Sequence, residues 1–185
     1  QRRFTKEYTK LKDVICKNIL GALKAITLTY SRGLLTNGSH NIDLLFYLMG
    51  DDTVIESYVV SKHLGSSPTF ILDLKDDISV SVIGFEAPYH CFDTICTFEK
   101  GRASVVHGGM DTRWEIAIAH ENYPGFFRLK ESNDRLLGNG GLDCPMNNAL
   151  NELINSYEEK REPVSSLVTA SKSLMLIDAI LSECE

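Results

Sequence analysis

The first fifty residues alternate between patterns typical of helix and of strand. Residues 5–18 carry apolar side chains three or four positions apart, which predicts an amphipathic helix. Residues 23–30 are rich in β-branched and aromatic side chains and predict a strand. Residues 40–49 are strongly apolar and predict a helix that ends at Gly50. The apolar positions of the first helix are Phe4, Tyr8, Leu11 and Ile15.

The middle of the chain reads as short strands separated by turn signals such as Asp76-Asp77 and Gly108-Gly109. Alternation is clear over residues 78–82, where isoleucine and valine face one way and serine the other. Connections this short permit hairpins but not parallel crossovers, so we expect a mainly antiparallel sheet. The predicted strands span residues 54–62, 69–74, 78–85, 91–98, 102–107, 114–120 and 126–130.

Two helices are predicted at the end of the chain. Pro145 is a favourable first helical residue, and Pro163 lies in the link between the two helices. The apolar face of the first of these helices consists of Met146, Leu150, Leu153, Ile154 and Tyr157. That of the second consists of Leu167, Ala170, Leu174, Ile177 and Leu181.

Segregated helices and strands predict the α+β class, with an open, mainly antiparallel β-sheet and helices packed on one face. Residues 1–185 are expected to form a single domain. Both faces of the sheet carry some apolar area, so a second copy could bury what the helices leave open. We therefore expect a homodimer or higher homo-oligomer through the sheet face. The strand residues behind this expectation are Phe92, Ile95, Val105 and Val106.

Composition and charge narrow the class of partner. The chain has 185 residues, 43% of them hydrophobic, with a net charge of −6 and scattered basic residues. Neither a nucleic acid nor a membrane surface is therefore an expected partner. The five cysteines have long, irregular spacings, which predicts free thiols in a reducing cytoplasm and no metal site. They are Cys16, Cys91, Cys96, Cys144 and Cys184.

Nucleotide-binding and hydrolase motifs are absent from the sequence. It contains no GxGxxG after a strand, no GxxxxGK[ST] and no GxSxG. Residues 138–141 (Gly-Asn-Gly-Gly) look like a phosphate loop, but they follow no parallel strand and are predicted to be a flexible turn. A cofactor-dependent redox enzyme would therefore need a nucleotide-binding site that these residues alone do not supply.

The stretch around His40 is the informative one. A histidine in the first turn of an apolar helix lies in the positive field of the helix dipole, which favours a neutral imidazole that can accept a proton. Asp43 could orient that ring or simply favour the helix start, and Asn37 or Ser39 could cap the helix. A histidine at such a position also commonly serves as a cap or a packed residue, and its spacing alone names no reaction.

Other candidates each have a structural alternative. Arg32 could contact a substrate hydroxyl or phosphate, or it could be a solvated loop residue. Tyr30 and Trp114 could stack on a sugar, but aromatic residues on strands are usually core residues. Tyr89 could line the cleft. The remaining histidines are predicted to lie at the surface or in packing contacts; they are His63, His90, His107 and His120.

Residues 38–44 (Gly-Ser-His-Asn-Ile-Asp-Leu) resemble the glycine-x-histidine-x-x-aspartate-leucine stretch of the Gfo/Idh/MocA family of NAD(P)-dependent oxidoreductases. Both ends of the chain are similar to the start and the end of that family's second domain, so the resemblance covers nearly the whole chain. The segments that carry it are Arg2-Arg3-Phe4, Leu11-Lys12, Leu20-Gly21, residues 149–154 and Arg161-Glu-Pro163.

The resemblance implies a substrate-binding and oligomerisation domain. The family's N-terminal Rossmann domain, which binds NAD or NADP and supplies a catalytic lysine, has no counterpart in this chain. His40 would be the acid/base on the hydroxyl of a sugar, sugar derivative or nucleotide sugar. Arg32, Thr36, Asn37 and Asp43 would bind that substrate. Thr36 is a departure, because many members carry an aspartate there, and this leaves the proton relay in doubt.

Two other classes of function stay open. The same fold could be a non-catalytic dimerisation or ligand-binding module in which His40 is structural. A small hydrolase using His40 and Asp43 is a weaker alternative, because no nucleophile accompanies them in the sequence. The chain opens at Gln1 without a methionine, so we expect a fragment that is inactive by itself and does not bind NADH.

Overall fold

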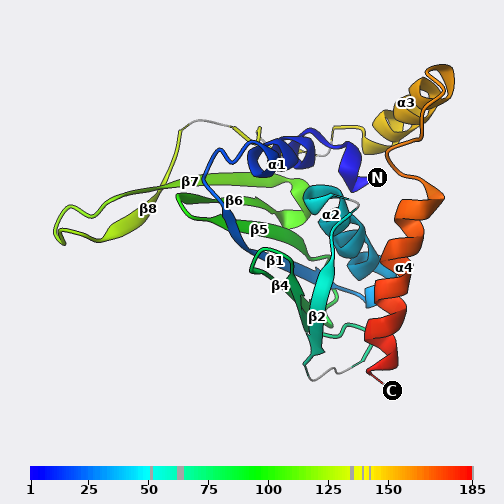
Figure 1. The fold of residues 1–185 in the computed structure, drawn as a ribbon, viewed down its shortest axis with the longest axis horizontal. Helices are drawn as coiled ribbons and strands as arrows, with labels where there is room; N and C mark the ends of the chain where they lie inside the picture. The colour runs from blue at the N-terminus through cyan, green and yellow to red at the C-terminus, as the bar shows by residue number, and fades with distance from the viewer. Residues whose placement is uncertain (51, 62–64, 134–135, 139, 142, 185) are drawn as a thin grey trace.

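The computed structural model of this chain describes residues 1–185 except residues 51, 62–64, 134, 135, 139, 142 and 185 (Figure 1). Four α-helices are present in the described part, α1 (Lys6–Cys16), α2 (Ser39–Met49), α3 (Pro145–Glu158) and α4 (Leu167–Ser182). The strands there are β1 (Leu23–Ser31), β2 (Ile55–Val60), β3 (Phe70–Leu74), β4 (Ile78–Phe85), β5 (Phe92–Phe98), β6 (Gly101–Val106), β7 (Asp111–Ala119) and β8 (Phe127–Glu131).

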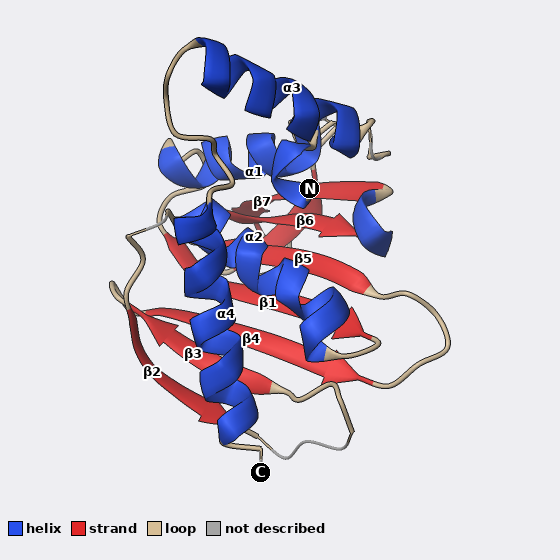
Figure 2. Ribbon diagram, turned by 90° about the vertical axis from the view of Figure 1, so that its right-hand side faces the viewer, coloured by secondary structure: helices blue, strands red, loops and turns tan. Residues whose placement is uncertain are grey.

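The strands form one open sheet in the order β2-β3-β4-β1-β5-β6-β7-β8. The helices lie on one side of it, with α2 and α4 across its centre and α3 furthest out (Figures 1 and 2). Neighbouring strands are antiparallel except for β1 and β4. The predicted α+β class, with an open and mainly antiparallel sheet, is confirmed. Among the described residues, no helix is long and apolar enough to cross a membrane.

The parallel β1–β4 pair is the feature that hairpin reasoning missed. After β1 the chain runs through α2, β2 and β3 before β4 returns beside β1, with Thr27 opposite Ser81. A long connection of this kind allows a parallel crossover. As a result β4 and β5, which are consecutive in the sequence, lie on opposite sides of β1, and the loop between them passes over the end of β1.

The core lies between the sheet and α1, α2 and α4. The predicted alternation in β4 is confirmed, because Val80 and Val82 are fully buried whereas Ser79 and Ser81 are not. Large side chains of β1 and α2 fill the centre of this layer, and hydrophobic burial of this kind is the main favourable contribution to folding. The largest fully buried side chains include Tyr8, Leu11, Ile26, Leu28, Ile42, Leu45 and Phe70.

Helix α3 departs from the expected packing. Its apolar residues do fall on one face, but they point to solvent, and Ser156 is the buried residue of this helix. Met146, Leu150 and Tyr157 are 65%, 56% and 85% exposed. Because periodicity identifies a face and not what covers it, the sequence could not distinguish a core helix from one whose apolar face stays open.

Candidate functional site

The C-terminal end of β1 is joined to the β4–β5 loop by two hydrogen bonds of one hydroxyl. Ser31 Oγ donates to the backbone oxygen of Tyr89 at 2.7 Å and accepts from the backbone N–H of Cys91 at 2.9 Å. Directly after Ser31 the backbone turns through two positive φ angles, 69° at Arg32 and 94° at Gly33. The β4–β5 loop and the start of the next helix therefore meet at this end of the sheet.

His40 follows a π-helical turn that spans Leu34–Gly38 and leads directly into α2. The N–H of Gly38 donates to the carbonyl of Gly33 at 3.1 Å, which closes this wide turn. A Cβ on Gly38 would lie 2.8 Å from the Leu34 side chain, so a larger residue does not fit there without a shift. His40 thus lies within a continuous helical segment and not at a free helix start.

The predicted caps are wrong for this reason. Neither Asn37 nor Ser39 caps α2 through its side chain. The hydroxyl of Ser39 instead donates to the carbonyl of Thr36 at 2.6 Å, and the amide of Asn37 donates to the carbonyl of Ser31 at 2.8 Å. Because the preceding turn already satisfies the backbone, no side-chain cap is required.

The pKa of His40 lies below its ordinary value, in the direction that the sequence predicted but for a different reason. Partial burial lowers the pKa first, and the positive charge of Arg2 lowers it further, while Asp43 opposes them. The side chain still reaches solvent and is not enclosed by apolar residues. A neutral imidazole accessible from outside is the form that accepts a proton.

His90 joins this site, although the sequence placed it among surface or packing residues. Its Nδ1 lies 3.1 Å from the amide nitrogen of Asn37, and its Nε2 lies 3.3 Å from a guanidinium nitrogen of Arg2. The His90 ring stacks on the Phe92 ring with an interplanar angle of 7°. The guanidinium carbon of Arg2 lies 4.3 Å from the centre of the Phe92 ring. Arg2 also donates to the carbonyl of Gly108.

The pKa of His90 is lowered by burial and then by the charges of Arg2 and Arg32, with Asp93 opposing. Both nitrogen atoms of this ring lie near a donor, but a neutral imidazole has one acceptor nitrogen, so it accepts a hydrogen bond from either Asn37 or Arg2 and not from both. The sequence signal for His90 was its place in the loop between two strands. Only the strand order, which the sequence does not reveal, shows that this loop passes over β1.

Asp43 binds Arg3 and forms no hydrogen bond with His40. The guanidinium of Arg3 donates to both carboxylate oxygens at 2.8 and 2.6 Å, and also to the carbonyl of Val164 at 3.1 Å. Arg3 is buried, and the pair joins the start of the chain to α2 and to the link between α3 and α4. Through charge alone, Asp43 raises the pKa of His40 against the larger effects that lower it.

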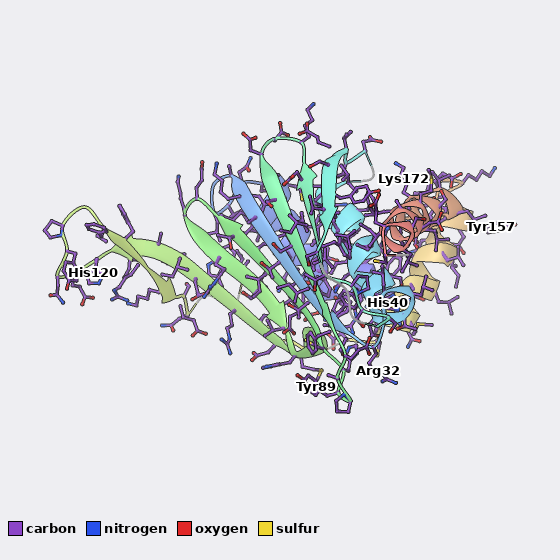
Figure 3. All side chains as sticks on the ribbon, turned by 90° about the horizontal axis from the view of Figure 1, so that it is seen from below. Arg32, His40, Tyr89, His120, Tyr157 and Lys172 are labelled. Atoms are coloured by element: carbon purple, nitrogen blue, oxygen red, sulfur yellow. The ribbon has the colours of Figure 1, made fainter. Side chains whose placement is uncertain are left out.

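Thr36 and Arg32 complete the turn. The hydroxyl of Thr36 donates to the carbonyl oxygens of Arg32 and Gly33, so it closes the turn through the backbone. The Arg32 side chain is exposed. In Figure 3, Arg32, His40 and Tyr89 lie toward the same end of the molecule, whereas His120 lies at the far end of the β7–β8 hairpin.

The other candidates are accounted for separately. Tyr30 is fully buried, with its hydroxyl donating to the carbonyl of Pro68 at 2.6 Å, and Trp114 is 8% exposed, so both are core residues. His107 lies near Asp111 and His120 contacts Tyr123. His63 lies outside the described residues, as do Asn139 of the glycine-rich turn and Lys62 at the end of a predicted strand.

Cavities form elsewhere on the chain. One of about 490 Å³ is lined by Asp111–Trp114 and by residues of the 131–138 segment, and another of about 480 Å³ is lined by Phe46, Thr53 and Met175 among others. Neither includes His40. The described residues contain no group of three or more histidines, cysteines or acids placed to hold a metal ion.

The fold is shared with one part of many solved oxidoreductases and dehydrogenases. The WlbA dehydrogenase from Bordetella pertussis, in complex with NADH and UDP-GlcNAcA, has 16% identity and a TM-score of 0.71 over 98% of this chain and 60% of that chain. A dehydrogenase from Chromobacterium violaceum has 13% identity and a TM-score of 0.72, covering 98% and 59%. An NAD-binding protein from Listeria innocua has 12% identity and 0.68, covering 98% and 62%.

At these identities the likeness establishes the fold alone, and the chain spans about three fifths of the length of those structures. No protein-family model and no curated protein matched the chain.

Proposed function

We propose that this chain is the substrate-binding half of an NAD(P)-dependent dehydrogenase that acts on a sugar, a sugar derivative or a nucleotide sugar. The fold supports this, because the solved proteins that share it include dehydrogenases, one of them in complex with NADH and UDP-GlcNAcA. A separate nucleotide-binding domain would complete the enzyme. The observation that carries the proposal is an accessible imidazole, His40, whose pKa is lowered at the end of the central strand.

His40 is the proposed acid/base. In its neutral form the ring accepts the proton of the substrate hydroxyl, and in the reverse direction the imidazolium returns it. The charge of Arg2 and partial burial disfavour the imidazolium at rest, so the free site is ready to accept a proton. Asn37 and Arg32 are the proposed substrate contacts. Thr36 and Asp43 act by positioning α2. The hydroxyl of Thr36 donates to the backbone of the turn, and the carboxylate of Asp43 binds Arg3.

The strand-to-helix connection after β1 does not fit the phosphates of a nicotinamide cofactor. In the strand-to-helix connection after β1, the N–H of Gly33 donates to Ser67 Oγ and the N–H of Leu34 donates to the Ser66 carbonyl, both at 2.8 Å. These donors are therefore not free to bind a phosphate. A nicotinamide held by another domain would supply the hydride acceptor, and this chain would supply the proton acceptor and the substrate contacts.

The test uses the full-length protein. Replacing His40 with alanine is expected to lower turnover roughly 10²–10⁴-fold while cofactor binding survives, since general acid–base catalysis contributes about that much. His120→Ala, on the far hairpin, is the matched control and should leave turnover unchanged. Unchanged turnover in the His40→Ala protein would return His40 to a structural role.

The second candidate is a non-catalytic module that dimerises through the helix-free face of the sheet. One cross-strand row on this face runs through six strands without a charged residue before it reaches Arg113. An uncharged row of this kind suits a second copy of the chain. The six residues of this row are Val59, Ile71, Ser81, Thr27, Ile95 and Ser104.

The free thiols suit a cytoplasmic protein.

A further inference from the structure

The positive charge of arginine side chains gathers at the end of β1 and is opposed only in part by Asp43 and Asp93. Arg2 acts on the imidazoles of both His40 and His90, and Arg32 acts on His90. Figure 3 shows that Arg32 lies toward the same end of the molecule as His40. Two arginines and two histidines therefore share this site, which is unusual in a chain whose net charge is −6.

The nearby carboxylates are already engaged. Asp43 is bound by Arg3 through both of its oxygen atoms. Asp93 accepts a hydrogen bond from the backbone N–H of His107 at 2.7 Å, and Glu86 accepts one from Ser66 Oγ at 3.0 Å. In the part of the chain that the structure describes, the Arg32 guanidinium has no hydrogen bond or ion pair. Because this residue is exposed, its five donors are accessible to a ligand in solution.

The backbone of Arg32 is fixed although its side chain is free. Its φ angle of 69° lies in the left-handed region, which is costly for a residue with a Cβ. Its carbonyl oxygen accepts the Thr36 hydroxyl, and the carbonyl of the preceding Ser31 accepts the Asn37 amide. Held backbone strain of this kind is common at residues that clamp a ligand.

We propose that this site binds an oxyanion, namely a carboxylate or phosphate group of the sugar substrate, with Arg32 as its main contact and the charge of Arg2, beside the His90 ring, completing the positive field. The assignment of this anion to a sugar substrate rests on the proposed function. A planar guanidinium matches both oxyanions through paired hydrogen bonds, and a site enriched in positive charge raises the local concentration of an anionic ligand. A neutral sugar would leave this charge unused.

The experiment titrates the full-length protein with inorganic phosphate, D-glucuronate and D-glucose, and follows the imidazole signals of His40 and His90 by NMR. Saturable shifts are expected with phosphate and glucuronate. Arg32→Gln should weaken both about tenfold or more, because a hydrogen bond to a charged group is lost. Arg32→Lys should keep part of the affinity, and Arg113→Gln, an exposed arginine on the helix-free face, should keep all of it. D-Glucose binding, if any, should not respond to Arg32.

Repeating the titration with saturating NAD⁺ separates the two sources of phosphate. An anion that belongs to the substrate must still bind when the cofactor is in place. Loss of anion binding in the presence of NAD⁺ would assign the positive charge to the cofactor and overturn the proposal. So would the absence of saturable shifts, or equal binding by the Arg32→Gln protein.

This test does not require turnover, so it fails independently of the proposed function. If the anions bind but His40→Ala retains full turnover, the anion site stands and the acid/base role falls. If His40→Ala is inactive but neither anion binds, the dehydrogenase stands with a neutral substrate. Circular dichroism of each Arg32 variant guards against loss of fold as the cause of weak binding.

Discussion

Arg3 and Asp43 form a two-point ion pair that fastens the first turn of the chain to α2. The Nε and one terminal nitrogen of Arg3 donate to the two carboxylate oxygens at 2.8 and 2.6 Å. The side chain of Arg3 is 1% exposed and that of Asp43 is 25% exposed. Since α2 carries His40, this pair fixes the helix on which the candidate site is built.

Breaking this pair is expected to destabilise the fold. Asp43→Asn removes the carboxylate that binds the buried Arg3 guanidinium at two points, and removing one partner of a buried pair is strongly destabilising. Because Asp43 is partly exposed, we expect a loss of about 2 kcal/mol in the free energy of unfolding, measured by urea denaturation.

Asp13→Asn is the matched control. Asp13 pairs with Lys17 at 3.0 Å on the surface of α1, where both side chains are more than half exposed. Surface pairs of this kind contribute less than about 0.5 kcal/mol. Equal losses from the two variants would contradict the structural role of the Arg3–Asp43 pair.

The stability of the domain should depend on pH through His40 and His90. Burial and then positive charges hold both pKa values below the ordinary histidine value of 6.5. The charged side chains that face them are Arg2, Arg32, Asp43 and Asp93. Below about pH 6.5 the unfolded chain therefore takes up protons that the folded chain resists, and stability falls as the pH drops toward the folded-state pKa values.

Urea denaturation between about pH 5.5 and 7.5 measures this effect. The double variant His40→Asn/His90→Asn should show a smaller loss of stability on acidification than the unmodified protein. Arg2→Met removes a charge that acts on both rings, so the pKa of each should rise in an NMR titration. An unchanged pH slope in the double variant would show that neither ring resists protonation in the fold.

Most of the fold followed from local patterns. The alternation of residues 78–82 and the 3.6-residue periodicity of residues 5–18 gave strands and helices with small errors at their ends. The β1–β4 pairing did not follow, because it depends on which strands lie side by side after a long crossover. The open apolar face of α3 did not follow either, because its cover is not specified by its own sequence.

The candidate site was predictable only in part. His40 and its neighbours are close in sequence, so the segment could be identified from its residues. Arg2 and His90 are far from it in sequence, and their arrival beside Asn37 depends on the strand order. The role of Asp43 was missed for the same reason, since its partner Arg3 lies 40 residues away.

Thiol labelling separates the cysteines by environment. Burial raises the pKa of Cys96 to about 12, and this residue is fully buried, whereas Cys16 and Cys144 are exposed. Only thiolates react quickly, and only where a reagent can reach them. With a maleimide at neutral pH, we expect Cys16 and Cys144 to react first, and Cys96 to react only after unfolding, as read by peptide mass spectrometry. Rapid labelling of Cys96 in the folded protein would contradict its burial in the core.

The helix-free face of the sheet provides the last test, which concerns assembly. Ile83 is 39% exposed on β4, opposite Thr29 of the central strand, on the face that no helix covers. If two copies pack through this face, Ile83→Glu places two buried carboxylates close together across a two-fold axis, which is unfavourable for both desolvation and charge. Light scattering of the full-length protein should then show a shift from dimer to monomer.

Ile116→Glu is the control for that shift. Ile116 has nearly the same exposure, 37%, but it faces the other side of the β7–β8 hairpin, opposite Lys130. Its substitution should leave the dimer intact, because a carboxylate there stays in solvent beside an amine. If Ile83→Glu remains as dimeric as Ile116→Glu, the copies associate through some other surface, and the uncharged row on this face needs a different partner.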